Sequence, residues 1–434
     1  MKEEIKSIIV KTPDDWHLHL RESPIIEKVL PYSYKSYGRA IIMPNLEIPI
    51  ITFSQAKRYY EKIKYLIKTG NNFEPLMTLF LSEDTKVEDV YEGVKSGIIK
   101  AIKFYPQGVT TNSSGGIKNL SKIYKILEKI ADFGIPLLIH GETSNTEIDI
   151  YDREAYFLEE TVLGIRKNIP NLKIVLEHIT TKESVDFVLE SKKNVAATVT
   201  AHHLIINRNH IFDGGIRPHF YCRPIAKREE HRIAVRAAAT SGNSKFFLGT
   251  DSAPHFDHNK ENSCGCAGVF SSPNALGYVA QVFEEDSCIN NLENFISING
   301  AKFYNLPLNS SLTQFRKLKE AIKYPEKIKI GKNMITLFNP GYPLYWENEI
   351  LAWKIWEGKS LINIDKNIAR TTAKLLLEIN AVHFNSIKPF TLTSGLKSPV
   401  YIDCRKLISY PKARSILINF CSEIIIKKIG LNKI

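Results

Sequence analysis

Residues 15–21 have the sequence DWHLHLR, which places two imidazoles, His17 and His19, two positions apart in an apolar run. In a β-strand, residues i and i+2 project from the same face, so these two side chains would lie side by side. Two ligands of one metal ion need that arrangement. Histidines at this spacing are also common on protein surfaces and in cores, so the metal interpretation depends on the rest of the chain.

Short apolar runs alternate with amphipathic segments of helical period through the first 255 residues. The runs lie at 16–20, 39–44, 75–81, 101–105, 136–140, 173–178, 195–201 and 246–251, and helical segments at 54–68, 87–95, 120–133, 153–167, 182–190 and 226–239. This alternation predicts parallel strands joined by helices and fits an α/β fold of the (β/α)8 TIM barrel type. A doubly wound open sheet is the alternative, but no Gly-rich dinucleotide-binding fingerprint follows the first strand.

Polar residues stand at or near the C-terminal ends of the expected strands, where a barrel gathers them around one mouth. They are His17, His19, Asn45, Lys103, His140, His178 and Asp251. Burying an unpaired cation costs free energy, so a strand core has no structural use for histidine or lysine there. If each of these were an unrelated core residue with its own hydrogen-bond partner, their recurrence at the ends of successive strands would be poorly explained.

Four histidines and one aspartate in this set are nitrogen and oxygen ligands suited to Zn²⁺. A mononuclear catalytic zinc usually takes about three protein ligands, so five such groups predict two Zn²⁺ per subunit. Lys103 is the candidate bridge between them. Because an ammonium group would repel two dications, Lys103 must be neutral or modified, and a CO2-derived carbamate (N6-carboxylysine) would make it an anionic bidentate ligand.

Longer motifs in the chain resemble the dihydroorotases of the bacterial single-domain type, within the amidohydrolase superfamily, over about residues 8–346. The motifs are PDDWHLHLR (13–21), MPNL (43–46), KFYP (103–106), TTNSS (110–114), HGE (140–142), EHIT (177–180), NRNH (207–210), GTDSAPH (249–255) and SCGCAG (263–268). They occur in order and are specific to that family.

The resemblance implies a role for each matched residue. His17, His19, Asp251 and carboxylated Lys103 correspond to ligands of the more buried metal, and His140, His178 and the same Lys103 to those of the second. The residues implied in substrate binding are Arg21, Asn45 and His255 at an α-carboxylate, main-chain groups of Cys222, Arg223 and Ala267 at a pyrimidine ring, and Thr110 and Thr111 on a mobile loop. Family members often have an apolar residue at position 223, but a main-chain contact tolerates arginine there.

The implied reaction is the reversible interconversion of N-carbamoyl-L-aspartate and (S)-dihydroorotate in pyrimidine (UMP) biosynthesis, with Asp251 as the proton-transfer group. One alternative is another cyclic-amide hydrolase of the superfamily that acts on hydantoin-like rings, which would not need the carboxylate-binding set of Arg21, Asn45 and His255. A second alternative is a non-catalytic barrel that serves as a scaffold for pyrimidine enzymes. The chemically complete set of metal and proton-transfer residues argues against that scaffold.

Beyond residue 346 the barrel pattern stops. We assign 1–346 to the barrel, 347–366 to a connector, and 367–434 to a small incomplete α+β segment with helices expected at 368–380 and 411–428. Residues 390–405, FTLTSGLKSPVYIDCR, resemble the N-terminal region of orotate phosphoribosyltransferase. No acidic pair followed by a Gly/Thr phosphate-binding loop comes after Asp403, so this segment is predicted to be inactive as a phosphoribosyltransferase on its own.

Composition excludes several other classes of function. The formal net charge is +12, but lysine is spread along the helical segments, so we expect no nucleic-acid partner. The six cysteines are scattered, as in reduced thiols, and no apolar stretch suits a signal or a membrane span, so we expect a cytoplasmic protein without a membrane partner. The resemblance implies a homodimer. His202 and His203, near a strand end, are expected to form hydrogen bonds rather than bind metal.

Overall fold

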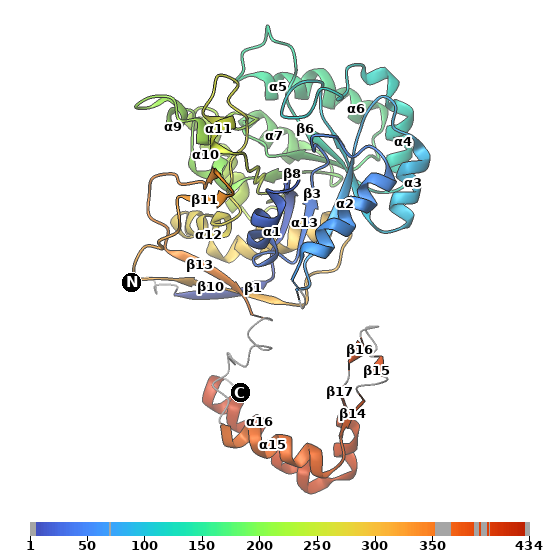
Figure 1. The fold of residues 1–434 in the computed structure, drawn as a ribbon, viewed down its shortest axis with the longest axis vertical. Coiled ribbons are helices and arrows are strands. Elements are labelled where there is room, and N and C mark those ends of the chain that lie inside the picture. Colours follow the sequence, from blue (N-terminus) through green and yellow to red (C-terminus); the bar gives the residue numbers. More distant parts are fainter. Residues whose placement is uncertain are drawn as a thin grey trace. The chain divides into compact units, whose positions relative to one another are not determined.

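A computed structural model describes residues 6–68, 71–351, 366–385, 390–391, 397–398 and 400–429. The chain divides into two compact units, Met1–Ala352 and Trp353–Ile434 (Figure 1). Among the described residues, no helix combines the length and the apolar character that a membrane crossing requires.

The first unit is built on eight parallel strands that neighbour one another in chain order. They are β2 (Asp14–Leu18), β3 (Arg39–Ile42), β4 (Glu74–Phe80), β5 (Ile99–Phe104), β6 (Leu137–His140), β7 (Ile174–Glu177), β8 (Val195–Val199) and β9 (Phe246–Leu248). After β9, the Asp251 N–H donates to the His17 carbonyl at 2.9 Å, and Ser252 forms a parallel bridge with Leu18. The last strand thus meets the first, and the expected (β/α)8 barrel is confirmed.

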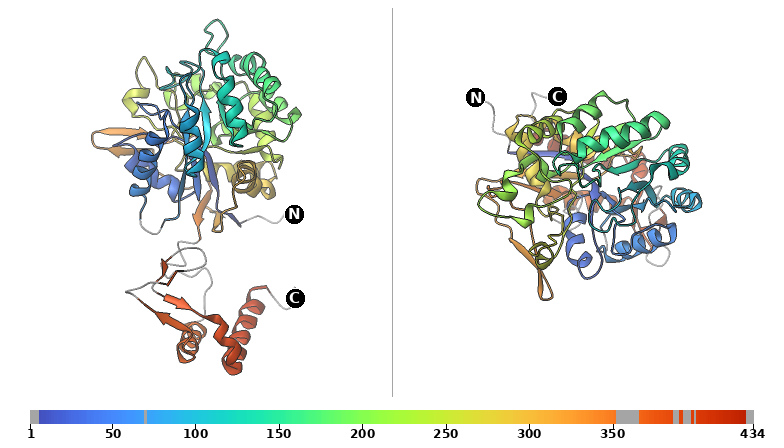
Figure 2. Two further views of the ribbon diagram at one scale, coloured as in Figure 1. Left: turned by 90° about the vertical axis from the view of Figure 1, so that its right-hand side faces the viewer. Right: turned by 90° about the horizontal axis from the view of Figure 1, so that it is seen from above.

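The helices of this unit surround the strands, most of them on the outside (Figure 2). They are α1 (Ile26–Tyr34), α2 (Phe53–Leu66), α3 (Val87–Lys95), α4 (Tyr124–Asp132), α5 (Arg153–Phe157), α6 (Leu163–Asn168), α7 (Lys182–Glu190), α8 (Ala201–Ile205), α9 (Asn209–Phe212), α10 (Glu229–Thr240), α11 (Asp257–Lys260), α12 (Ala275–Glu285) and α13 (Asn299–Phe303), with the 3-10 helices η1 (Leu120–Lys122), η3 (Pro218–Phe220) and η4 (Ile289–Asn291) and the π-helical segments η2 (Leu158–Val162) and η5 (Asn294–Ile298). The sequence pattern did not predict α1, which contains Pro31, or α12, in which residues 275–283 are all buried. Proline argues against a helix, and a helix buried on every side has no polar face to produce an amphipathic pattern.

Alternating side chains of the strands fill the barrel interior. One apolar layer consists of Trp16, Ile41, Leu76, Ala101, Leu138, Val175, Ala196 and Phe247, and it packs with Ala301 and Tyr304. Trp16 stacks on Tyr304 with ring centroids 4.4 Å apart. Side chains two positions further along a strand point to the same interior, so the next layer includes Lys103, His140, Glu177 and Thr198. The apolar layer therefore supports a polar one at the carboxyl ends of the strands.

Shorter strands complete the first unit. β1 (Ser7–Lys11), β10 (Leu312–Lys317) and β13 (Trp346–Ile350) form an antiparallel sheet, and β11 (Lys327–Ile330) pairs with β12 (Asn333–Thr336) as a hairpin. Residues 347–350, assigned from the sequence to the connector, continue a strand whose register pairs Ile350 with Thr313. Residues 352–365 of the expected connector lie outside the described residues, and Lys366 begins the first helix of the second unit.

The second unit mixes helices and short strands. It contains α15 (Lys366–Glu378), β14 (Val382–Phe384), β15 (Phe390–Thr391), β16 (Lys397–Ser398), β17 (Val400–Ile402), η6 (Cys404–Ser409) and α16 (Pro411–Ile429). Pro411 takes the first position of α16, where its missing N–H costs nothing. Residues 392–396 and Pro399 of the stretch that resembles orotate phosphoribosyltransferase lie outside the described residues, so that resemblance stays a prediction.

The barrel floor gives a stability test. A Cβ at Gly300 would lie 2.1 Å from Nε1 of Trp16, whose indole is held by its stack on Tyr304. We expect Gly300→Ala to destabilise the fold by about 1–3 kcal/mol through overpacking, seen as a lower midpoint of thermal unfolding. At Gly164 in α6 the nearest atom to a new Cβ is Tyr124 Oη at 3.7 Å, so Gly164→Ala should keep or raise the midpoint. Equal midpoints for the two variants would contradict this packing.

Candidate active site

A small cavity lies at the carboxyl ends of the barrel strands. Its lining consists of His17, His19, Arg21, Asn45, Tyr105, Thr110, Thr111, His140, His178, Arg223, Asp251, Ala253, Ala267 and Gly268. All the residues singled out from the sequence as site residues are in this lining except Lys103, Cys222 and His255. Residues from seven of the eight strands and their following loops, all except β4, thus meet at one small polar chamber.

Three ligand-type atoms from opposite ends of the barrel sequence meet in this chamber. Nε2 of His17 and Nε2 of His19 are 3.2 Å apart, and Oδ1 of Asp251 lies 3.3 Å from the first and 3.1 Å from the second. Burial lowers the pKa of both imidazoles, that of His19 to about 3. Both rings are therefore neutral, which is the form that binds metal.

The Asp251 carboxylate is ionised. Burial by itself would raise its pKa, but the contacts with His17 and His19 hold the pKa well below its ordinary value. An ionised carboxylate can accept a proton or bind a cation. This residue is therefore equipped for either task.

Lys103 is fully buried inside the barrel, beneath the cavity. Its Nζ contacts Oε2 of Glu177 and lies 4.7 Å from the centre of the Tyr105 ring. Burial lowers the pKa of Lys103 well below its ordinary value, which favours the neutral amine. Oε1 of Glu177 also lies 3.0 Å from Nδ1 of His17, so this carboxylate links the lysine to the ligand cluster.

Two further imidazoles stand beside these groups. The rings of His140 and His178 have centroids 4.9 Å apart, and the His178 ring is also 4.9 Å from that of His17. Nε2 of His140 is 2.9 Å from Oε2 of Glu142, whereas Nδ1 of His178 is buried without a hydrogen-bond partner among the described residues. Burial lowers the pKa of both rings, so they too are neutral.

An unusual backbone conformation sets the orientation of three of these side chains. Asp251 and His178 both have φ of 45°, and Arg21 has φ of 61°. A non-glycine residue in this left-handed region is uncommon and strained, and such strain gathers at functional sites. The strand ends therefore hold His178, Asp251 and Arg21 in orientations that relaxed backbone would not give.

A buried carboxylate holds the two ends of the barrel sheet together behind the cavity. Oδ1 of Asp15 accepts from the N–H groups of His17 at 3.1 Å and Thr250 at 2.8 Å, and Oδ2 accepts from Oγ1 of Thr250 at 2.6 Å. Burial raises the pKa of Asp15 to about 6. These bonds fix the backbone of His17 and the residue before Asp251 at the same time.

The residues expected at a substrate carboxylate form a second group in the cavity wall. Nη2 of Arg21 lies 2.9 Å from Nε2 of His255, and Nε of Arg21 donates to the Pro254 carbonyl. Burial and the Arg21 charge lower the pKa of His255 well below its ordinary value, so the guanidinium carries the positive charge of the pair. On the other side, Nδ2 of Asn45 donates to the Thr111 carbonyl at 3.0 Å, which docks the Thr110–Thr111 loop on the cavity rim.

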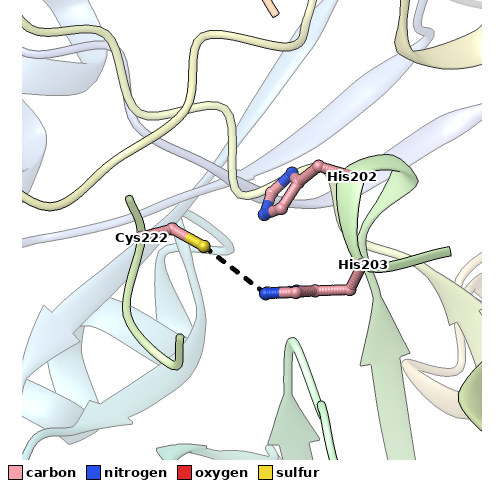
Figure 3. A group of neighbouring side chains, drawn as sticks. All are labelled: His202, His203 and Cys222. Carbon is pink, nitrogen blue, oxygen red and sulfur yellow. Dashed lines mark hydrogen bonds between the residues drawn. The ribbon is translucent and has the colours of Figure 1, made fainter. Parts of the chain in front are cut away.

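Cys222 belongs to a buried group with His202 and His203, whose side chains face one another (Figure 3). Nε2 of His203 is 3.1 Å from the Pro224 carbonyl, and its Nδ1 is 3.0 Å from Oγ1 of Thr200. The Cys222 thiol lies 3.4 Å from the same Nε2, and burial raises its pKa to about 12, so it stays protonated. His203 thus forms the expected hydrogen bonds, whereas both nitrogens of His202 lack a partner among the described residues.

Comparisons with known proteins agree with this geometry. Residues 9–313 match the Amidohydrolase family. The chain is 49% identical to a dihydroorotase of Chelativorans sp. (strain BNC1) over 345 residues, which is 80% of this chain and 100% of that protein. This chain belongs to the dihydroorotase family.

Solved structures of the dihydroorotase family have the same fold. The dihydroorotase of Saccharomyces cerevisiae, in complex with 5-fluoroorotic acid, is 34% identical with a TM-score of 0.73, covering 80% of this chain and 99% of that one. The dihydroorotase of Campylobacter jejuni is 35% identical with a TM-score of 0.72 and the same coverage. These matches cover 80% of this chain, and the residues that match the family model, 9–313, lie within the first unit. This chain is accordingly a hydrolase of the cyclic-amide class.

Sequence reasoning about this dihydroorotase family member assigned no role to five residues of the site: Tyr105, Glu142, Glu177, Ala253 and Gly268. A signal existed for two of them, because Tyr105 and Glu177 stand two positions after the interior residues Lys103 and Val175. Strand alternation alone points both side chains inward. Glu142 and Gly268 lie on loops, whose path the strand pattern does not determine.

Because Thr250 and Asp15 together fix the backbone of His17 and the residue before Asp251, we expect metal affinity to depend on the Thr250 hydroxyl. Thr250→Val keeps the side-chain shape but removes the hydroxyl that donates to Oδ2 of Asp15. We expect the variant to bind divalent metal about tenfold more weakly in competition with a chelator, because supporting bonds orient the ligands. Thr78→Val, which removes a buried hydroxyl donating to the Ile42 carbonyl at 2.6 Å, is the matched control and should keep its metal affinity. Loss of affinity in both variants or in neither would count against a specific role for Thr250.

Proposed function

We propose that this chain is a zinc-dependent dihydroorotase that interconverts N-carbamoyl-L-aspartate and (S)-dihydroorotate in pyrimidine biosynthesis. The observation that carries the proposal is a single cavity in which the His17–His19–Asp251 cluster lies beside the Arg21 guanidinium. Hydrolysis of a cyclic amide needs a centre that activates water, and a fixed guanidinium selects a substrate that also bears a carboxylate. The yeast relative was solved with 5-fluoroorotic acid, a pyrimidine ring with a carboxylate, which supports this substrate class.

The residues present fit two divalent metals. Ligand atoms around a tetrahedral Zn²⁺ with bonds of about 2.0–2.1 Å are roughly 3.3 Å apart, close to the 3.1–3.3 Å of the His17–His19–Asp251 cluster. The unpartnered buried Nδ1 of His178 is a second sign of an unfilled bonding position. His17, His19, Asp251 and Lys103 would hold one metal, and His140, His178 and the same Lys103 the other. When bound, the two metals supply Lewis-acid polarisation of a carbonyl and lower the pKa of water.

Lys103 can be a shared ligand of two dications only if its side chain carries a negative charge. Burial favours its neutral amine, whose lone pair can bond to the carbon of CO2. The new N–C bond forms as one C=O π bond of CO2 opens and the nitrogen releases a proton, which leaves a carbamate anion on Nζ. Carboxylated Lys103 would then help to hold both metals, and the buried positive charge of a lysine would be avoided.

The chain's own residues orient the substrate. Arg21, with Asn45 and His255, would bind the α-carboxylate, because a guanidinium recognises a planar carboxylate with two N–H groups. Main-chain groups of Cys222, Arg223 and Ala267 would contact the pyrimidine ring. The Thr110–Thr111 loop would close over the bound substrate, exclude water and donate hydrogen bonds to it.

Asp251 would move the proton. In the hydrolytic direction it accepts a proton from the attacking water, and it then donates that proton to the ring nitrogen as the amide C–N bond breaks. The ionised state of Asp251 supports the first of these steps. The ring-closing direction uses the same group in reverse order.

Asp251→Asn tests this proton transfer. An amide cannot accept the proton, so we expect kcat for dihydroorotate hydrolysis to fall by about 10²–10⁴-fold while 5-fluoroorotate binding is partly retained. Asp132→Asn, which changes an exposed aspartate paired with Lys129 on α4, is the control and should behave as the wild type. A near-normal kcat in Asp251→Asn would show that another residue transfers the proton.

Substrate selectivity separates this proposal from the hydantoinase-like and scaffold alternatives. Dihydrouracil has the same ring as dihydroorotate without the carboxylate, so the wild type should turn it over at least about 10³-fold less efficiently. Arg21→Met should lower kcat/KM for dihydroorotate by about 10²-fold or more, and so reduce the preference for dihydroorotate over dihydrouracil. Arg228→Met, at an exposed position, should leave both kcat/KM and this preference unchanged. Equal use of both rings would favour a hydantoinase-like enzyme, and absence of turnover with every cyclic amide would favour the scaffold.

A further inference from the structure

Lys260, the last residue of α11, is a buried lysine near the cavity that the proposed reaction does not use. Its side-chain Nζ donates to three main-chain carbonyls, those of Tyr221 at 3.1 Å, Cys266 at 2.8 Å and Gly268 at 2.6 Å. An ammonium group has three N–H donors, so this group is fully satisfied by two loop segments that are far apart in the sequence. The lysine therefore joins the 221–223 segment to the 266–268 segment.

These contacts set the direction of two main-chain N–H groups. In a planar trans peptide the C=O and the next N–H point in opposite directions. Carbonyls of Tyr221 and Cys266 that point at Lys260 leave the N–H groups of Cys222 and Ala267 pointing away from it. Among the described residues neither N–H donates to a protein group, although Ala267 lines the cavity and Cys222 is buried.

The position of Lys260 is itself fixed. Asp257, at the start of α11, pairs with Lys327 at 2.7 Å and accepts from the N–H and hydroxyl of Thr336 on the β11–β12 hairpin. The two loop segments are also joined directly, because the Gly268 N–H donates to the Tyr221 carbonyl at 3.0 Å. The ammonium thus sits in a rigid frame and cannot simply follow a moving loop.

We propose that Lys260 is a positioning residue that presets the N–H groups of Cys222 and Ala267 as donors to the oxygens of the substrate ring. The inference rests on the proposed function, because it assigns the ring of that substrate to these donors. A cation at the carbonyl oxygen also polarises each peptide and strengthens its N–H as a donor. Donors that are fixed before binding need no reorganisation when the substrate arrives.

Lys260→Met is the direct test. The variant keeps much of the side-chain volume but removes the charge and all three donors, so KM for dihydroorotate should rise about tenfold or more while kcat changes by less than about threefold. The Kd for 5-fluoroorotate, measured by calorimetry, should rise by the same factor. Lys260→Gln keeps two N–H donors without the charge, and its KM and Kd should lie between those of the wild type and Lys260→Met.

Lys245 provides a matched control. Its Nζ also donates to three main-chain carbonyls, those of Val188, Leu189 and Ser191, but Lys245 does not line the cavity. Lys245→Met should lower the thermal unfolding midpoint without changing KM or the Kd for 5-fluoroorotate. A purely structural role for Lys260 would make the two lysine variants alike, and that result would overturn the inference.

The pH dependence of KM gives an independent measure. Burial lowers the pKa of Lys260 to about 8, and the titratable or charged groups that interact with it are the Cys222 and Cys266 thiols, Arg21, Asp257, His202 and His255. As pH rises through 8 the ammonium loses its proton, so the wild-type KM should rise. In Lys260→Met this rise should be absent although both thiols remain.

The outcomes separate this inference from the proposed function. Wild type that binds 5-fluoroorotate but has no dihydroorotase activity would refute the proposed function, and weaker binding by Lys260→Met would still support the inference. Wild type that neither binds nor turns over would overturn both. If Lys260→Met does not fold, Lys260→Gln becomes the test variant. An unchanged KM and Kd in Lys260→Gln would then overturn the inference.

Discussion

The buried Asp15 carboxylate joins the first barrel strand to the segment that follows the last, and the geometry of the cavity depends on that junction. A barrel closes only where its first and last strands meet, so the bonds from Thr250 and the His17 N–H to Asp15 set how the two segments lie. His17 and His19 come from one side of this junction and Asp251 from the other. The distances of 3.3 and 3.1 Å from Asp251 to the two imidazoles therefore depend on barrel closure, whereas the 3.2 Å between the imidazoles is set within the first strand segment.

The polar layer above the barrel floor is costly for the fold. It holds neutral imidazoles, a lysine without exposure to water and two residues with φ of 45°. Buried polar groups and strained backbone each reduce stability, and the large apolar layer beneath them offsets that cost. Bound metal ions and a carbamate on Lys103 would remove much of the remaining penalty, because ligation satisfies atoms such as Nδ1 of His178.

Much of the barrel could be predicted from the sequence, because strand and helix periodicities differ and the polar residues recur at strand ends. Lys103 and His140 were found in this way, and the same alternation would have identified Glu177 from the interior position of Val175. The helix α12 could not be found from amphipathic period, since it is buried on every side. Nor could the meeting of the 221–223 and 266–268 segments at Lys260, which depends on the path of loops and on contacts distant in sequence.

Turnover in the proposed mechanism depends on two metal ions held in this cavity. The decisive measurement is the metal content per chain of the purified protein, followed by dihydroorotate turnover after chelation and after zinc is restored with bicarbonate. We predict two metal ions per chain, loss of turnover as they are removed, and recovery when both are returned. Full turnover by a chain that retains no metal would contradict the mechanism.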